Sequence, residues 1–141
     1  MRFMMLVIPK GYESAPQDAL PSADAVAKMM KYNEALAKAG VLLSLDGLVP
    51  PSAGARVSFS GGKPKVTDGP FAEAKECVGG YWMIQVKSKE EAIEWIKRSP
   101  FQEGEIEIRQ VFEADDFGPA LTPELREAEE RLRARVAAQQ E

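Results

Sequence analysis

The sequence predicts an α+β domain, because strand patterns and helix patterns alternate along its 141 residues. Three observations indicate this class. A continuous apolar run near the N-terminus is typical of a central strand. Two later segments have apolar residues at helical spacing. A Gly-Gly pair joins two short strand-like runs and favours a β-hairpin. The length suits one domain of ~100 to 150 residues that can bury a core of its own.

The first strand and the first helix are predicted from apolar spacing and from breakers. Residues 3–8 are apolar throughout, as expected for a strand covered on both faces. A helix is predicted over residues 23–39, with Ser22 as its cap and Gly40 as its stop. Its apolar residues recur at helical spacing: Val26, Met29, Met30, Leu36 and Ala37.

The next strand, residues 41–48, has two different faces. Leu43 and Leu45 alternate with Ser44 and Asp46, so the leucines are expected on one face and the polar pair on the other. The hairpin follows after two prolines that end this strand.

The hairpin is predicted from residues 56–60 and 63–67, which flank Gly61 and Gly62. Glycines tolerate the positive φ angles that tight hairpin turns require. Residues 80–86 then form a further strand.

The second helix begins at Ser88, which has with Glu91 the spacing of a capping box, and it ends near Pro100. Residues 105–112 form the last predicted strand of the domain. Two isoleucines alternate with two charged residues along it: Ile106, Glu107, Ile108 and Arg109.

The C-terminal segment, residues 114–141, is expected to be a linker followed by an amphipathic helix. Residues 115–119 have linker composition, and Thr122-Pro123-Glu124 is a favourable helix start. The helix is expected to reach about Ala138, with a narrow apolar stripe formed by Leu125, Ala128, Leu132 and Val136. Such a helix would lie against the domain or a partner subunit, or form a solvated tail.

Composition excludes several classes of function. Acidic residues outnumber basic ones 22 to 18, and no basic run could neutralise a phosphate backbone, so nucleic acid is not an expected partner. No apolar stretch approaches the roughly 20 residues that cross a bilayer, and no signal-peptide cleavage site follows Met1, so a cytoplasmic protein is expected. Cys77 is the single cysteine and histidine is absent, which leaves no disulfide, no thiolate cluster and no expected cofactor. A metal held by oxygen ligands alone stays open.

If the helices cover one face of the sheet, alternation assigns the polar residues to the opposite face. The helix-covered face would include Leu43, Leu45, Ile106 and Ile108. The opposite face would carry Ser44, Asp46, Tyr81, Met83, Gln85, Glu107 and Arg109. A second copy could cover that face and leave a pocket between two sheets.

The run from Asp68 to Tyr81, DGPFAEAKECVGGY, is the most specific motif of the chain. Together with the Gly-Gly hairpin, Ala92-Ile93-Glu94-Trp95, Ser99-Pro100 and Glu107-Ile108-Arg109, it resembles the DGPF branch of the YCII-related family over residues 1–113. The resemblance implies a ferredoxin-like antiparallel sheet with two helices on one face plus a hairpin, paired into a dimeric α/β barrel. Gln110 stands where the family commonly has proline.

The resemblance also bears on chemistry, because some relatives look like small enzymes that use a histidine–aspartate pair. Without histidine, a carboxylate would do the proton transfer of a cofactor-free lyase, isomerase or hydrolase. Asp68 is the first candidate for the acid/base, and Tyr81 is a candidate hydrogen-bond donor. The candidate substrate-binding residues are Asp46, Glu73, Lys75, Glu76, Glu107 and Arg109.

Other interpretations of these residues stay open. Asp68-Gly69 is good turn chemistry in itself, and Glu73, Lys75 and Glu76 can form a solvated segment. Glu107 and Arg109 can pair across a dimer, and Cys77 is expected to be a buried residue rather than a nucleophile. The competing functional class is a non-catalytic binding or regulatory module, since similar proteins are associated with extracytoplasmic-function sigma factors. A sigma factor is then a candidate partner, with the C-terminal helix as docking element.

Overall fold

A computed structural model describes residues 1–69 and 76–140 of the chain. The chain divides into two compact units, residues 1–110 and residues 111–141. The first unit contains a four-stranded antiparallel sheet with the order β2-β5-β1-β6 and a separate two-stranded sheet, β3-β4. Its strands are β1 (Arg2–Pro9), β2 (Leu42–Gly47), β3 (Ala55–Ser60), β4 (Lys63–Asp68), β5 (Gly80–Gln85) and β6 (Gly104–Gln110).

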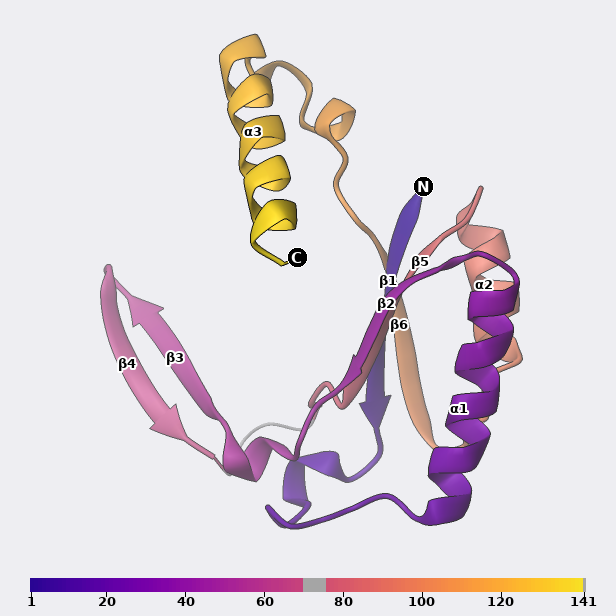
Figure 1. The fold of residues 1–141 in the computed structure, drawn as a ribbon. Coiled ribbons are helices and arrows are strands. Elements are labelled where there is room, and N and C mark those ends of the chain that lie inside the picture. The colour runs from indigo at the N-terminus through magenta and orange to yellow at the C-terminus, as the bar shows by residue number, and fades with distance from the viewer. Residues whose placement is uncertain (70–75, 141) are drawn as a thin grey trace. The chain divides into compact units, whose positions relative to one another are not determined.

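Two helices, α1 (Ala23–Lys38) and α2 (Lys89–Lys97), lie on one face of the four-stranded sheet (Figure 1). Without the β3-β4 hairpin, the element order is βαββαβ and the sheet order is that of a ferredoxin-like fold. The predicted α+β class is therefore confirmed, with the hairpin inserted between the second and third strands of the large sheet.

The helix starts form as the capping residues predict. The Ser22 hydroxyl oxygen accepts a hydrogen bond from the Ala25 N–H at 3.1 Å, and the Ser88 hydroxyl oxygen accepts one from the Glu91 N–H at 3.1 Å. The Glu91 carboxylate accepts from the Lys87 N–H at 2.9 Å, one residue before the position that the capping box predicts. Local capping chemistry thus fixes where both helices begin.

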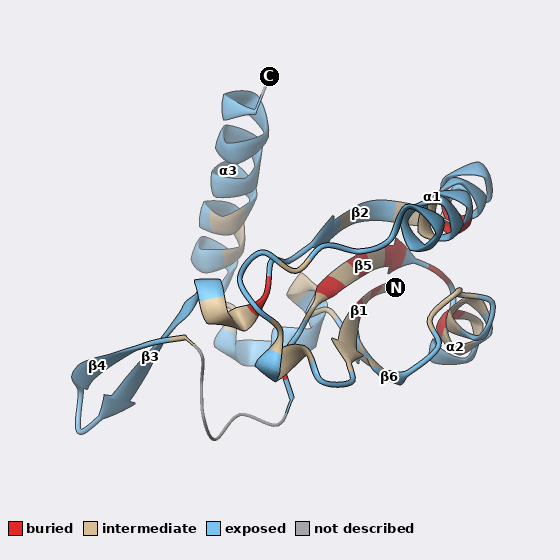
Figure 2. Cartoon of the chain, turned by 90° about the horizontal axis from the view of Figure 1, so that it is seen from below, coloured by how far each residue is buried: buried red, intermediate tan, exposed pale blue. Residues whose placement is uncertain are grey.

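The core lies between the sheet and the two helices, where the buried parts of β5, α1 and α2 are seen in red (Figure 2). Its buried members are Phe3, Met5, Tyr32, Leu36, Trp82, Ile84, Val86 and Ala92. The Trp82 Nε1–H donates a hydrogen bond to Asn33 Oδ1 at 2.8 Å, and the Tyr32 hydroxyl donates to the Trp95 carbonyl oxygen at 2.6 Å. Burial raises the pKa of Tyr32 to about 12, an effect that the charge of Arg98 partly opposes, so this hydroxyl keeps its proton at neutral pH.

The expectation that Leu43 faces the helices is wrong. Leu42 pairs with Ile84 and Ser44 pairs with Met83, so the register shifts at Leu43. Leu42 and Leu45 pack against the core, whereas Leu43 is 47% exposed. A bulge adds one residue to one strand of a pair, and a simple alternation pattern cannot reveal it.

The β3-β4 hairpin turns at Gly61 and Gly62, as predicted. Their φ angles are 58° and 80°, and positive φ at both central residues is what a type I′ turn requires. Beyond the turn, Val57 pairs with Val66 and Phe59 pairs with Pro64.

The second unit contains a short 3-10 segment and the C-terminal helix α3 (Pro123–Gln139). The 3-10 segment, Ala114–Ala120, lies where the linker is expected and has a kink at Gly118. Phe112 stacks on Phe117 with ring centroids 4.8 Å apart, and Arg126 forms an ion pair with Asp115 at 3.0 Å, so local contacts order this stretch. No helix in the described part of the chain is long and apolar enough to cross a membrane.

Candidate functional site

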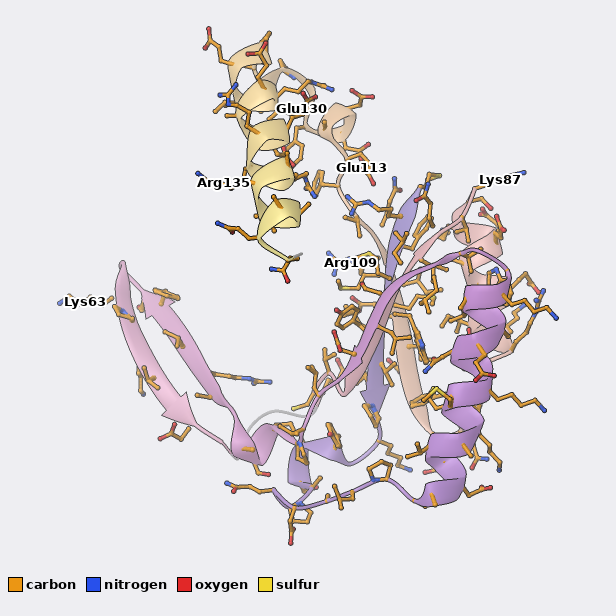
Figure 3. The ribbon with its side chains drawn as sticks, viewed as in Figure 1. Lys63, Lys87, Arg109, Glu113, Glu130 and Arg135 are labelled. Atoms are coloured by element: carbon orange, nitrogen blue, oxygen red, sulfur yellow. The ribbon has the colours of Figure 1, made fainter. Side chains whose placement is uncertain are left out.

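The sheet face opposite α1 and α2, here called the open face, collects four of the eight predicted site residues, namely Asp46, Tyr81, Glu107 and Arg109. The strand register defines it, because directly paired residues share a face. Leu6 pairs with both Tyr81 and Glu107, and Tyr81 pairs in turn with Asp46. The open face comprises Arg2, Met4, Leu6, Ile8, Ser44, Asp46, Tyr81, Met83, Gln85, Glu105, Glu107 and Arg109. Figure 3 shows Arg109 on the side of the sheet away from the two helices.

The centre of the open face is apolar. Met4, Leu6, Ile8 and Met83, here called the apolar strip, are half-buried by their neighbours within one chain. The strip follows from the apolar run in the first strand, whose alternate residues Phe3 and Met5 fill the core on the other side. A strand with two apolar faces therefore has one face packed by helices and one that the first unit leaves partly open.

Two polar pairs flank the apolar strip. On one side, the Tyr81 hydroxyl donates a hydrogen bond to Asp46 Oδ2 at 3.1 Å. On the other side, Arg109 Nη1 lies 3.1 Å from Glu107 Oε2, and both side chains are exposed, at 70% and 49%. Solvated ion pairs of this kind contribute at most about 1 kcal/mol to stability, so the fold does not depend on them.

The spacing of the strands gives the width of this arrangement. Neighbouring strands lie about 4.8 Å apart, so the three steps from Asp46 through Tyr81 and Leu6 to Glu107 span about 14 Å. Such a distance suits a small organic molecule that contacts the apolar strip and reaches a polar pair at each end.

Asp68 lies outside the open face. It ends β4, where it pairs with Ala55, and its side chain is exposed. The next residue has a clear structural role: the Gly69 N–H donates to the Gly54 carbonyl oxygen at 2.8 Å, and a Cβ on Gly69 would lie 2.0 Å from the Pro51 carbonyl oxygen. The geometry thus explains the glycine of the motif, while the acid/base role of Asp68 stays a prediction.

The remaining candidates belong to the segment after Asp68. Glu73 and Lys75 lie outside the described residues. Glu76 is exposed and lines an open depression of about 400 Å³ at the base of the hairpin. Cys77, buried as expected, also lines this depression, and Arg56 Nη2 approaches its Sγ to 3.8 Å. Sequence reasoning missed Arg56, because nothing in its local pattern distinguishes it from any other polar strand residue.

Two further features of the sequence analysis are a metal site built from oxygen ligands, which stayed open there, and the exposed apolar stripe of the C-terminal helix. Within residues 1–69 and 76–140, no group of three His, Cys, Asp or Glu residues is arranged to hold a metal ion. In the second unit, the apolar stripe of α3 is about half exposed, with values of 53% for Leu125, 49% for Leu132 and 46% for Val136. Its role as a docking element stays a prediction.

Two comparisons with known proteins concern mainly the residues of the first unit. A family model described as the YCII-related domain matches residues 1–115. An uncharacterised protein of Rhizobium meliloti (strain 1021) is 37% identical over 84 residues, which cover 60% of this chain. The match spans 64% of that protein's length. Neither comparison specifies a ligand or a reaction.

Proposed function

The chain belongs to the YCII-related family, and on that premise we propose that it is a homodimer that binds a small organic acid in a cleft over the open face. The observation that carries the proposal is the apolar strip between two polar pairs. Ligand sites in proteins are commonly concave and mostly apolar, with a few well-placed polar groups.

A second copy is the cover that this face fits best. A two-fold axis presents the same surface of each subunit to the other, so one apolar strip can cover its equivalent. Each Å² of apolar surface that the contact removes from water stabilises the association by roughly 25 cal/mol. The polar pairs on both sides of the strip favour contact with water or with a ligand. The two sheets therefore leave a cleft between them beside the apolar contact.

The polar pairs indicate the ligand class. The guanidinium of Arg109 can bind a carboxylate through two parallel hydrogen bonds. On the other side of the strip, the Tyr81 hydroxyl can donate a hydrogen bond to a carbonyl group of the same molecule, and the Asp46 carboxylate can accept one from a hydroxyl group. A small carboxylic acid with a second oxygen function matches both ends and the apolar middle.

Leu6→Glu is expected to convert the dimer into a folded monomer. The substitution places a charge at the centre of the apolar strip, where association would have to bury it. Sedimentation velocity measures the change, with Leu20→Glu as a matched control, because Leu20 is 89% exposed and lies outside the sheet. A monomeric wild type, or a variant that dimerises as tightly as the wild type, would contradict the proposal.

A second candidate function is acid/base catalysis in the same cleft, and the hydrogen bond between Tyr81 and Asp46 favours it. A carboxylate beside a phenol can remove a proton from a carbon next to a carbonyl group while the phenol stabilises the resulting charge. Asp46 would then take the role that sequence analysis gave to Asp68.

Asp46→Asn is expected to slow proton exchange at such a carbon by about 10² to 10⁴-fold, the usual contribution of a positioned base. Proton NMR of small keto acids in D₂O measures the exchange with and without protein. Asp24→Asn is the control, because Asp24 is an exposed carboxylate on α1. Absence of exchange with the wild type would remove the catalytic candidate and leave the binding function untouched.

A further inference from the structure

The β3-β4 hairpin has two unlike faces. Val57, Phe59, Pro64 and Val66 share one face, because Val57 pairs with Val66 and Phe59 with Pro64. The opposite face carries the pairs Ser58–Lys65 and Ser60–Lys63. On the apolar face, Val57 is 52% exposed, Phe59 is 73% and Val66 is 64%, and Figure 2 shows both strands as exposed throughout.

Such a hairpin requires a cover. A two-stranded hairpin on its own is at best marginally stable in water. Among the described strands, β3 and β4 pair only with each other. Contiguous exposed apolar side chains commonly mark a contact surface.

Charge indicates what the cover is. The hairpin is basic, with three cations and a single carboxylate at its end: Arg56, Lys63, Lys65 and Asp68. Lys63 lies at its tip (Figure 3). The chain as a whole carries a net charge of −4, and strand β6 with the preceding residue carries Glu103, Glu105 and Glu107 against Arg109. The chain therefore contains its own electrostatic complement, at the edge of the open face.

We propose that the hairpin is an arm that reaches a second copy of the chain and closes its cleft along β6. Phe59 and Val57 cover the β6 side of the second copy's apolar strip, beside the contact between the two strips. Lys63 and Lys65 start from the other hairpin face, and their long side chains reach round the hairpin edge to the carboxylates of β6. Each ligand site is then composite, with Phe59 contributed by the other subunit. The inference rests on the proposed homodimer and specifies how its cleft is completed.

Cysteine cross-linking between differently tagged chains tests this arrangement. Cys77 is the single cysteine, so a Cys77→Ser background has no other thiol. Phe59→Cys chains mixed with Glu105→Cys chains are expected to form a covalent heterodimer with a short thiol cross-linker. Phe59→Cys mixed with Lys28→Cys is the control, because Lys28 lies on α1, on the other side of the sheet. Equal yields of covalent heterodimer from both mixtures would contradict the proposal that the hairpin is an arm.

A second measurement separates the arm from the dimer itself. Phe59→Asp is expected to weaken dimerisation by at least about tenfold, as for a central aromatic contact, while Leu20→Asp, which adds the same charge at an exposed residue outside both sheets, changes it much less. Equal dissociation constants for the wild type and Phe59→Asp would overturn the arm and leave the homodimer standing. A monomeric wild type would overturn both the arm and the homodimer.

The cross-linking experiment has one further outcome, in a single chain that carries both Phe59→Cys and Glu105→Cys. If the cross-link forms only within that chain, the hairpin lies over its own sheet and the inference is overturned.

Discussion

Trp82→Ala is expected to lower the free energy of unfolding of the first unit by about 4 kcal/mol, near the upper end for a buried aromatic residue. Trp82 is 3% exposed and lies in β5 beside the central strand. Its ring meets Tyr32 edge to face, with centroids 5.4 Å apart, and its Nε1–H satisfies Asn33 Oδ1. The substitution therefore removes a large buried surface, an aromatic contact and a hydrogen bond at once.

Trp82→Phe is the matched variant, because it keeps an aromatic ring and removes the indole N–H. It should cost about 1 to 3 kcal/mol, mainly for the hydrogen bond that Asn33 loses. Urea denaturation followed by circular dichroism measures both variants, and fluorescence of Trp95 provides a second probe. Two variants of equal stability would show that the hydrogen bond, rather than packing, dominates at this position.

The position of Trp82 also links the core to the open face. Successive residues of a strand point to opposite faces, so Trp82 in the core fixes the direction of Tyr81 towards Asp46. We expect Trp82→Ala to disturb the open face as well, whereas substitutions of Tyr81 should leave the core unchanged.

Much of this fold could be predicted from local chemistry. Ser22 and Ser88 begin the two helices, and the two central glycines turn the hairpin, because each acts through bonds or dihedral angles within a few residues. The polar residues of the open face were also predictable, since the two-residue period of a strand separates its faces wherever no bulge intervenes.

The features that local patterns do not predict have a common physical origin. The bulge at Leu43 depends on how β2 pairs with β5, and the 3-10 segment of residues 114–120 is accompanied by the stacking of Phe112 on Phe117. Asp68 and Tyr81 belong to one sequence motif but lie in different sheets, so the motif alone does not predict the distance between them. Proximity in sequence says little about strand pairing, and the approach of Arg56 to Cys77 likewise depends on the tertiary fold.

Gly69→Ala is expected to destabilise the base of the hairpin by about 2 to 3 kcal/mol, the usual cost of overpacking. The added Cβ would lie 2.0 Å from the Pro51 carbonyl oxygen, so the backbone must move and the hydrogen bond from the Gly69 N–H to Gly54 weakens. Amide hydrogen exchange at Gly69 and thermal unfolding report the change. Gly54→Ala is the control, because its Cβ would meet the nearest atom at an ordinary 3.5 Å.

Asp68→Asn, by contrast, should change stability by less than about 0.5 kcal/mol, as for most exposed positions, because its side chain lies in solvent at the end of β4. The two neighbouring substitutions thus separate the structural part of the motif from any chemical part. If Asp68→Asn unfolds the hairpin as Gly69→Ala does, the carboxylate has a structural role in the turn. If it leaves the fold and the dimer intact but abolishes ligand binding or proton exchange, Asp68 acts in a site that dimerisation completes, and the role proposed for Asp46 must be revised.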